Sequence, residues 1–202
     1  MEKLIRSLEI YLADCVGKMP ILYYSPDIEK LKIDYILSFN YTAIPTDVYP
    51  SLLDIRKHQI HGSAEVNHLA KDNDMVMGVN EYWGDSEKNF RTNFNAYKKF
   101  VQRIIKETGM DYKKALDRMQ DYGRGYIYIF GHSLDVTDGD ILREVILGPW
   151  RVTTIFYRNK QQQADQISNM SKVLGQDELI KRVFSSFPTI IFKQQADMVK
   201  RT

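Results

Sequence analysis

Short apolar runs alternate with longer amphipathic segments along this chain, and that alternation is what most constrains its fold. Runs rich in β-branched and aromatic residues, which are typical of strands, occur at 33–39, 126–130, 152–157 and 189–192. Apolar residues recur at helical spacing within the segments 2–16, 94–122, 141–146 and 160–186. Strands that alternate with helices indicate an α/β fold, with a largely parallel sheet flanked by helices.

The length of the chain suggests its domain organisation. Its 202 residues suit a single α/β domain over residues 1–202, with a helical insertion at about 84–122. In a sheet of this kind, ligands bind beyond the carboxyl ends of the strands. Polar residues that directly follow a strand are therefore the candidates for a functional site.

Charge and composition argue against several classes of protein. The formal net charge is +2, so no strong field favours nucleic acid or a membrane as a partner. The single cysteine, Cys15, cannot form an intramolecular disulfide, which fits a reducing compartment. No apolar run approaches the roughly 20 residues that span a bilayer. We expect a soluble, cytoplasmic protein without a metal site, because the ligand spacings typical of zinc and calcium are absent.

Three short motifs each follow a strand candidate. FNYT (39–42) follows the first run, IHG (60–62) ends a very short strand candidate at 59–62, and GHSLD (131–135) follows the run at 126–130. An amide, an imidazole and a hydroxyl thus stand at the ends of separate strands. We expect them to converge around one cleft.

The third motif nearly matches the nucleophile elbow of serine hydrolases, G-x-S-x-G. Its fifth position is Asp135 instead of glycine, and no histidine follows His132, although that class requires one after the serine. The other interpretation places a ligand at the start of the next helix. Gly131 permits close approach of the backbone, and Ser133 can bond a ribose or phosphate oxygen.

Asp135 and Asp138 each have two possible roles. Either can accept a hydrogen bond from a ribose hydroxyl, and either can serve as an ordinary cap of the helix that follows. Asn40 and His61 also have two possible roles each. Asn40 is either a turn residue or a ligand-facing amide, and His61 is either a buried histidine or a general base.

Three stretches closely resemble the AbiH family of bacterial abortive-infection proteins. They are FNYT, IHG and IFGHSLDVTD (129–138), and the amphipathic stretch LIRSLEIYL (4–12) also resembles that family's early helix. The likeness covers most of residues 1–157. It implies a role in phage defence, with a phage or host protein as trigger.

The AbiH family in turn resembles the sirtuin-like, Rossmann-like domains of other defence systems, which bind NAD and in several cases hydrolyse it. This resemblance implies NAD as substrate or ligand and assigns catalytic roles to Asn40 and His61. The implied ligand-binding positions are Tyr41, Thr42, Gly62, Gly131, His132, Ser133, Asp135 and Asp138.

Two features depart from the sirtuin-like pattern. Thr42 stands where that pattern has an acid, and a hydroxyl cannot supply the negative charge that stabilises an oxocarbenium-like ribose. The glycine-rich strand-to-helix turn that opens both families is also absent from this chain. These departures favour the alternative of a non-catalytic nucleotide-sensing or protein-interaction domain, which could act as a homo-oligomer.

A further alternative is an RNA-binding or RNA-cleaving protein. The chain has thirteen tyrosines and two lysine pairs, and tyrosines can stack on single-stranded bases. Most of the tyrosines fall within strand or helix patterns that predict core positions, so this alternative ranks below the other two.

Overall fold

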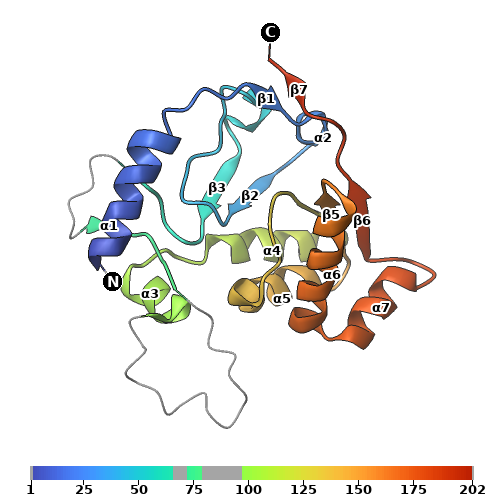
Figure 1. Ribbon diagram of the computed structural model, residues 1–202. Helices are drawn as coiled ribbons and strands as arrows, with labels where there is room; N and C mark the ends of the chain where they lie inside the picture. The colour runs from blue at the N-terminus through green and yellow to red at the C-terminus, as the bar shows by residue number, and fades with distance from the viewer. Residues whose placement is uncertain (1, 66–71, 79–96, 202) are drawn as a thin grey trace. The chain divides into compact units, whose positions relative to one another are not determined.

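The computed structural model describes residues 2–65, 72–78 and 97–201 (Figure 1). The chain divides into two compact units, and each is treated separately below. The first unit comprises residues 1–112 with 197–202, and the second comprises residues 113–196. The expected helical insertion falls partly outside the described residues, and the single domain that we expected stays a prediction.

The first unit combines helices with two pairs of short strands. Its helical elements are α1 (Glu2–Ile10), the π-helical η1 (Tyr11–Val16), α2 (Pro26–Glu29), the 3-10 turn η2 (Pro50–Leu52) and α3 (Lys99–Ile105). Its strands are β1 (Tyr23–Tyr24), β2 (Tyr35–Ser38), β3 (Arg56–Gln59) and β7 (Val199–Lys200). Strand β2 pairs with β3 in parallel, whereas β1 pairs with β7 antiparallel.

The second unit contains a three-stranded parallel sheet in the order β4-β5-β6. Its strands are β4 (Gly125–Ile129), β5 (Arg151–Tyr157) and β6 (Ile190–Gln194). Its helices are the 3-10 turn η5 (Val136–Asp138), α5 (Gly139–Leu147), α6 (Lys160–Leu174) and α7 (Gln176–Phe184). Helix α4 (Asp111–Asp121) begins in the first unit and lies mostly in the second.

Apolar side chains of α5, β5, α6 and β6 form the core of the second unit. The members at or below 2% exposure include Ile141, Ile146, Ile155, Met170 and Ile190. Burial of each such side chain contributes about 1.5–3 kcal/mol. These residues lie at the apolar positions that strand and helix periodicity predict.

The predicted α/β class is confirmed, with helices and small parallel sheets. Among the described residues the strands form three separate sheets of two or three strands. The strand expected at 59–62 lies earlier, because Gly62 adopts φ +77° and its N–H bonds Gln59 O at 3.1 Å in a turn. No helix in the described ranges combines the length and the apolarity needed to cross a membrane.

Tyr35 provides a test of this packing. Burial raises the pKa of the Tyr35 phenol to about 12, with a smaller contribution from Asp111. The hydroxyl is buried and has no hydrogen-bond partner among the described residues. Because the unfolded phenol ionises near pH ~10, the folded state is favoured below that pH, and this stability is lost as the pH rises toward 12.

We therefore expect Tyr35→Phe to be at least as stable as the wild type at pH 7 and to lose less stability above pH ~10. Urea unfolding at the two pH values measures both effects. The matched control is Tyr122→Phe, since Tyr122 is 86% exposed. A Tyr35→Phe variant that loses as much stability in alkali as this control would contradict the assignment.

Candidate functional site

The first group of candidate residues lies at the end of the β2–β3 pair. Ser38 is opposite Gln59 in the parallel register, and Ile60 N–H donates to Ser38 O at 3.0 Å. Because parallel strands run in the same direction, the segments 39–42 and 60–62 leave the pair at the same edge. Strand pairing thus brings FNYT beside IHG, as the sequence predicts.

The side chain of Gln59 holds the FNYT backbone. Its Nε2 lies 3.2 Å from Asn40 O, 3.1 Å from Tyr41 O and 3.3 Å from Thr42 O. A single amide therefore donates to carbonyls of three successive residues. The side chain of Asn40 remains exposed at this edge, and that of Thr42 is half-buried.

His61 is buried, with 3% of its surface exposed. Its ring meets Phe39 edge-on at a centroid distance of 5.6 Å and lies 6.5 Å from the ring of Tyr41. Tyr41 also donates its hydroxyl to Val76 O at 2.6 Å, and Val76 N–H donates to His61 O at 2.8 Å. The imidazole is thus packed near two aromatic rings and beside a fixed backbone.

The turn after His61 fits tightly against Asp74. A Cβ on Gly62 would lie 2.3 Å from the carbonyl oxygen of Asp74, so only glycine fits there. The same Asp74 accepts a hydrogen bond from Ser63 N–H at 2.9 Å through Oδ1. Glycine at position 62 is therefore required by packing, independently of any ligand.

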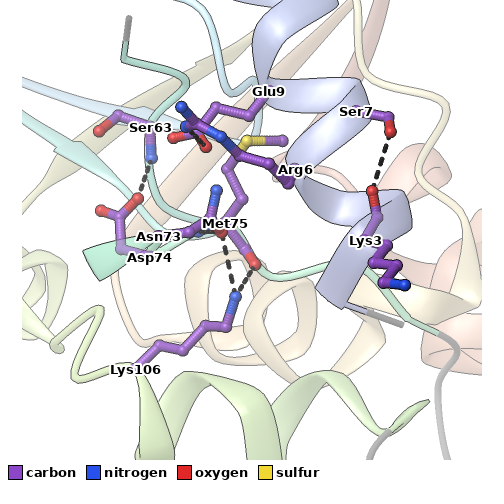
Figure 2. A network of polar contacts seen from close by, with 9 residues as sticks. All are labelled: Lys3, Arg6, Ser7, Glu9, Ser63, Asn73, Asp74, Met75 and Lys106. Atoms are coloured by element: carbon purple, nitrogen blue, oxygen red, sulfur yellow. Dashed lines mark hydrogen bonds and ion pairs between the residues drawn. The ribbon is translucent and has the colours of Figure 1, made fainter. Parts of the chain in front are cut away.

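A charged network lies beside this turn (Figure 2). Arg6 and Glu9 reach from α1 toward the segment 73–75, where they form an ion pair, and Glu9 is fully buried. Lys106 donates to Met75 O at 2.5 Å and to Asn73 Oδ1 at 3.2 Å. Burial lowers the pKa of the Lys106 amine, against the opposing effect of nearby carboxylates. The network holds the segment that supports Gly62 and His61.

The second group of candidates is the turn that follows β4. Gly131 has φ +66°, and Leu134, fully buried, has φ +60°, a conformation that non-glycine residues rarely adopt. Gly131 and Ser133 are exposed. A strained leucine kept in this conformation indicates a turn that its surroundings determine.

His132 stabilises the turn through both ring nitrogens. Leu134 N–H donates to its Nδ1 at 2.8 Å, and its Nε2 lies 3.5 Å from Asp138 Oδ2. Because Nδ1 accepts from the backbone, the proton of the neutral ring is on Nε2, facing the carboxylate. This His–Asp pair stabilises the turn.

Two amides of α6 hold the same turn. Gln166, 1% exposed, donates through Nε2 to His132 O and Phe156 O, both at 3.2 Å. Asn169 Nδ2 donates to Ser133 O at 2.9 Å. The carbonyls of residues 132 and 133 therefore both accept hydrogen bonds from α6. The exposed Ser133 follows the end of the parallel strand β4.

The acids of this region already have structural contacts. Asp135 caps η5 by accepting Thr137 N–H at 2.9 Å, and Asp138 is paired with His132. Asp140 stands in the first turn of α5. Three carboxylates at one helix start oppose the binding of a phosphate there, so the turn suits a sugar hydroxyl better than a phosphate.

The structure groups the candidates by unit. Asn40, Tyr41, Thr42, His61 and Gly62 lie together in the first unit. The second unit holds Gly131, His132, Ser133, Asp135 and Asp138. The common cleft between Asn40, His61 and Ser133 stays a prediction.

Sequence reasoning missed the amides that hold both motifs, Gln59, Gln166 and Asn169. Gln166 had one available signal, since a glutamine at an inward position of an amphipathic helix needs a buried partner. No such signal distinguishes Gln59 from other strand residues. In the parts of the chain that the structure describes, no three His, Cys, Asp or Glu side chains cluster to hold a metal ion.

The chain matches the family described as bacteriophage abortive infection AbiH over residues 1–157, and it belongs to that family. The matched region ends at the last residue of β5, so α6, with the amides that hold the GHSL turn, lies beyond it. No curated protein and no solved structure matches the chain.

The turn at Gly62 leads to a stability prediction. We expect Gly62→Ala to lower the free energy of unfolding by about 2–5 kcal/mol, because it adds a backbone clash to an unfavourable φ. Gly109→Ala is the matched control: Gly109 has φ +82° in the same unit, and among the described residues its added Cβ would meet only His58 Nε2, at 4.0 Å. It should cost about 1–2 kcal/mol. Equal losses in urea unfolding would show that contact with Asp74 is unimportant.

Proposed function

We propose that this AbiH-family protein acts in phage abortive infection by binding a nucleotide at the GHSL turn. The ligand places a ribose against Ser133 and Gly131, and NAD is the first ligand to test. The proposal rests on one observation: α6 amides and His132 hold the turn in a conformation in which Leu134 has a strained positive φ and Ser133 is exposed. Strain of this kind is characteristic of functional positions.

The residues of the turn fit one part of NAD better than another. A ribose hydroxyl can bond Ser133, whereas a pyrophosphate would approach the carboxylates of Asp135, Asp138 and Asp140. We therefore assign the sugar to this turn and leave the phosphates outside it. The Rossmann-like or sirtuin-like character of the fold is part of the same proposal.

The proposal favours sensing over catalysis because His61 is buried beside Phe39 and Tyr41. A general base must reach the proton that it removes, directly or through one water. Thr42 also supplies no negative charge to a developing oxocarbenium ion. A ligand bound without turnover would report the infected state to a phage or host partner.

Binding is tested by calorimetry with NAD, ADP-ribose and adenosine. We expect Ser133→Ala to weaken binding by about 3–10-fold, the value of one hydrogen bond. Ser168→Ala, at an exposed position of α6, should leave affinity unchanged. A wild-type chain that binds none of the three ligands would contradict the proposal.

A second candidate function is cleavage of the NAD glycosidic bond. It is favoured by Asn40, whose exposed amide lies at a strand end on a backbone that Gln59 holds in place, next to His61. In this reaction nicotinamide leaves, positive charge develops on the ribose, and water positioned by Asn40 and activated by His61 attacks.

Nicotinamide release, followed by chromatography, tests this second function. We expect Asn40→Ala and His61→Ala each to reduce the rate by about 100-fold or more. Asn40→Ala is the more informative variant, because the exposed Asn40 side chain contributes little to packing, whereas that of His61 is part of the core. Nicotinamide release at the same rate in the Asn40→Ala variant and the wild type would exclude the assigned roles, and binding without release would support sensing.

A further inference from the structure

One face of the β4-β5-β6 sheet carries exposed rings, and we call it the aromatic face. It consists of the alternate residues Tyr126 and Tyr128 of β4, Val152, Thr154 and Phe156 of β5, and Ile191 and Lys193 of β6. The register places Tyr128 beside Thr154, and Thr154 beside Ile191. The opposite face carries the buried residues Arg151, Thr153, Ile155 and Ile190.

The aromatic face is open along β4 and β6, whereas in the central strand Phe156 is 2% exposed and Val152 and Thr154 are half-buried. Tyr126 is 55% exposed, Tyr128 39% and Ile191 43%. Parallel sheets are normally covered on both faces. Most of the tyrosines were expected in the core, and these two are exceptions, because β4 alternates between an exposed side and a more buried side.

The chemistry of this face is aromatic and cationic. Phe130 continues the row of rings from β4 and stacks on Phe156 with centroids 4.0 Å apart. Lys193 Nζ lies 5.2 Å from the Phe156 ring centroid. Arg124 lies two residues before Tyr126, as Tyr126 does before Tyr128, and it is exposed. The positions that form this face include no acidic residue.

We propose that the aromatic face binds single-stranded nucleic acid. Tyr126 and Tyr128 lie about 6.6 Å apart along the strand, and each stacks on one base. Lys193 and Arg124 contact the backbone phosphates. Stacking on exposed sheet aromatics is sequence-tolerant, and it works together with a cationic surface that tracks the phosphates.

Charge favours this occupant over a second copy of the chain. In a two-fold dimer through this face, the same patch would meet itself. The face offers cations and no carboxylate, so the contact would bring like charges together. A polyanion is complementary to the same surface. The inference does not depend on the nucleotide proposed for the GHSL turn.

The test measures fluorescence anisotropy of a labelled uridine oligonucleotide of about 12 nucleotides with the full chain at low salt. We expect Tyr126→Ala with Tyr128→Ala to weaken binding by about tenfold or more for each ring. Tyr126→Phe with Tyr128→Phe keeps both rings and should retain the affinity. Tyr122→Ala, at an 86% exposed position outside the strand, should also leave it unchanged.

A second measurement uses charge, which keeps the proposal testable if the alanine pair fails to fold. Lys193→Gln should reduce the slope of log affinity against log salt by about 1. An unchanged slope, a wild-type chain that does not bind, or an alanine pair that binds like the wild type would each overturn the proposal. So would light scattering that shows a dimer dissociated by the alanine pair, because the occupant is then a second copy.

Discussion

Parallel strand pairing determines where every candidate side chain emerges, and side-chain amides determine how the chain continues beyond each pair. Gln59 donates to three carbonyls after β2, and Gln166 donates to carbonyls after β4 and near the end of β5. Gln102 acts similarly, bonding both the N–H and the carbonyl of Met77. Backbone groups that leave a sheet must find new partners, and in this chain glutamine side chains provide them. The exposed Asn40 and Ser133 side chains depend on these bonds for their position.

The two motif groups differ in what they can do chemically. His61 is buried beside the rings of Phe39 and Tyr41, and both ring nitrogens of His132 are engaged by Leu134 and Asp138. Asn40 and Ser133, by contrast, are exposed groups on well-held backbones. A site of this kind recognises hydroxyls and amides more readily than it transfers protons. This is the physical reason to place binding ahead of hydrolysis.

The sequence predicted the elements whose pattern is local. Strands β4, β5 and β6 coincide closely with the apolar runs, and helices α6 and α7 divide at Gly175 as helical spacing and the glycine indicate. The capping alternative for Asp135 is also confirmed by its bond to Thr137. The pairing of His132 with Asp138 could not be predicted, because it occurs in a turn where Leu134 adopts a left-handed conformation that residue type does not indicate. The exposure of Tyr126 depends on which side of the sheet the helices cover. The apolar character of the run at 126–130 does not predict which side that is.

The GHSL turn follows β4, the strand that contributes Tyr126 and Tyr128 to the aromatic face. The row Tyr126, Tyr128 and Phe130 leads directly to Gly131 and Ser133, so stacking surface and hydroxyl follow each other along the chain. The acids at the start of α5 oppose phosphate at the turn, whereas Lys193 and Arg124 attract it along the sheet. A nucleotide or strand end with its sugar at Ser133 would therefore direct its phosphates toward the cations of the face. Under the two proposals, this charge gradient predicts that a bound ligand places its hydroxyl-bearing end at the turn.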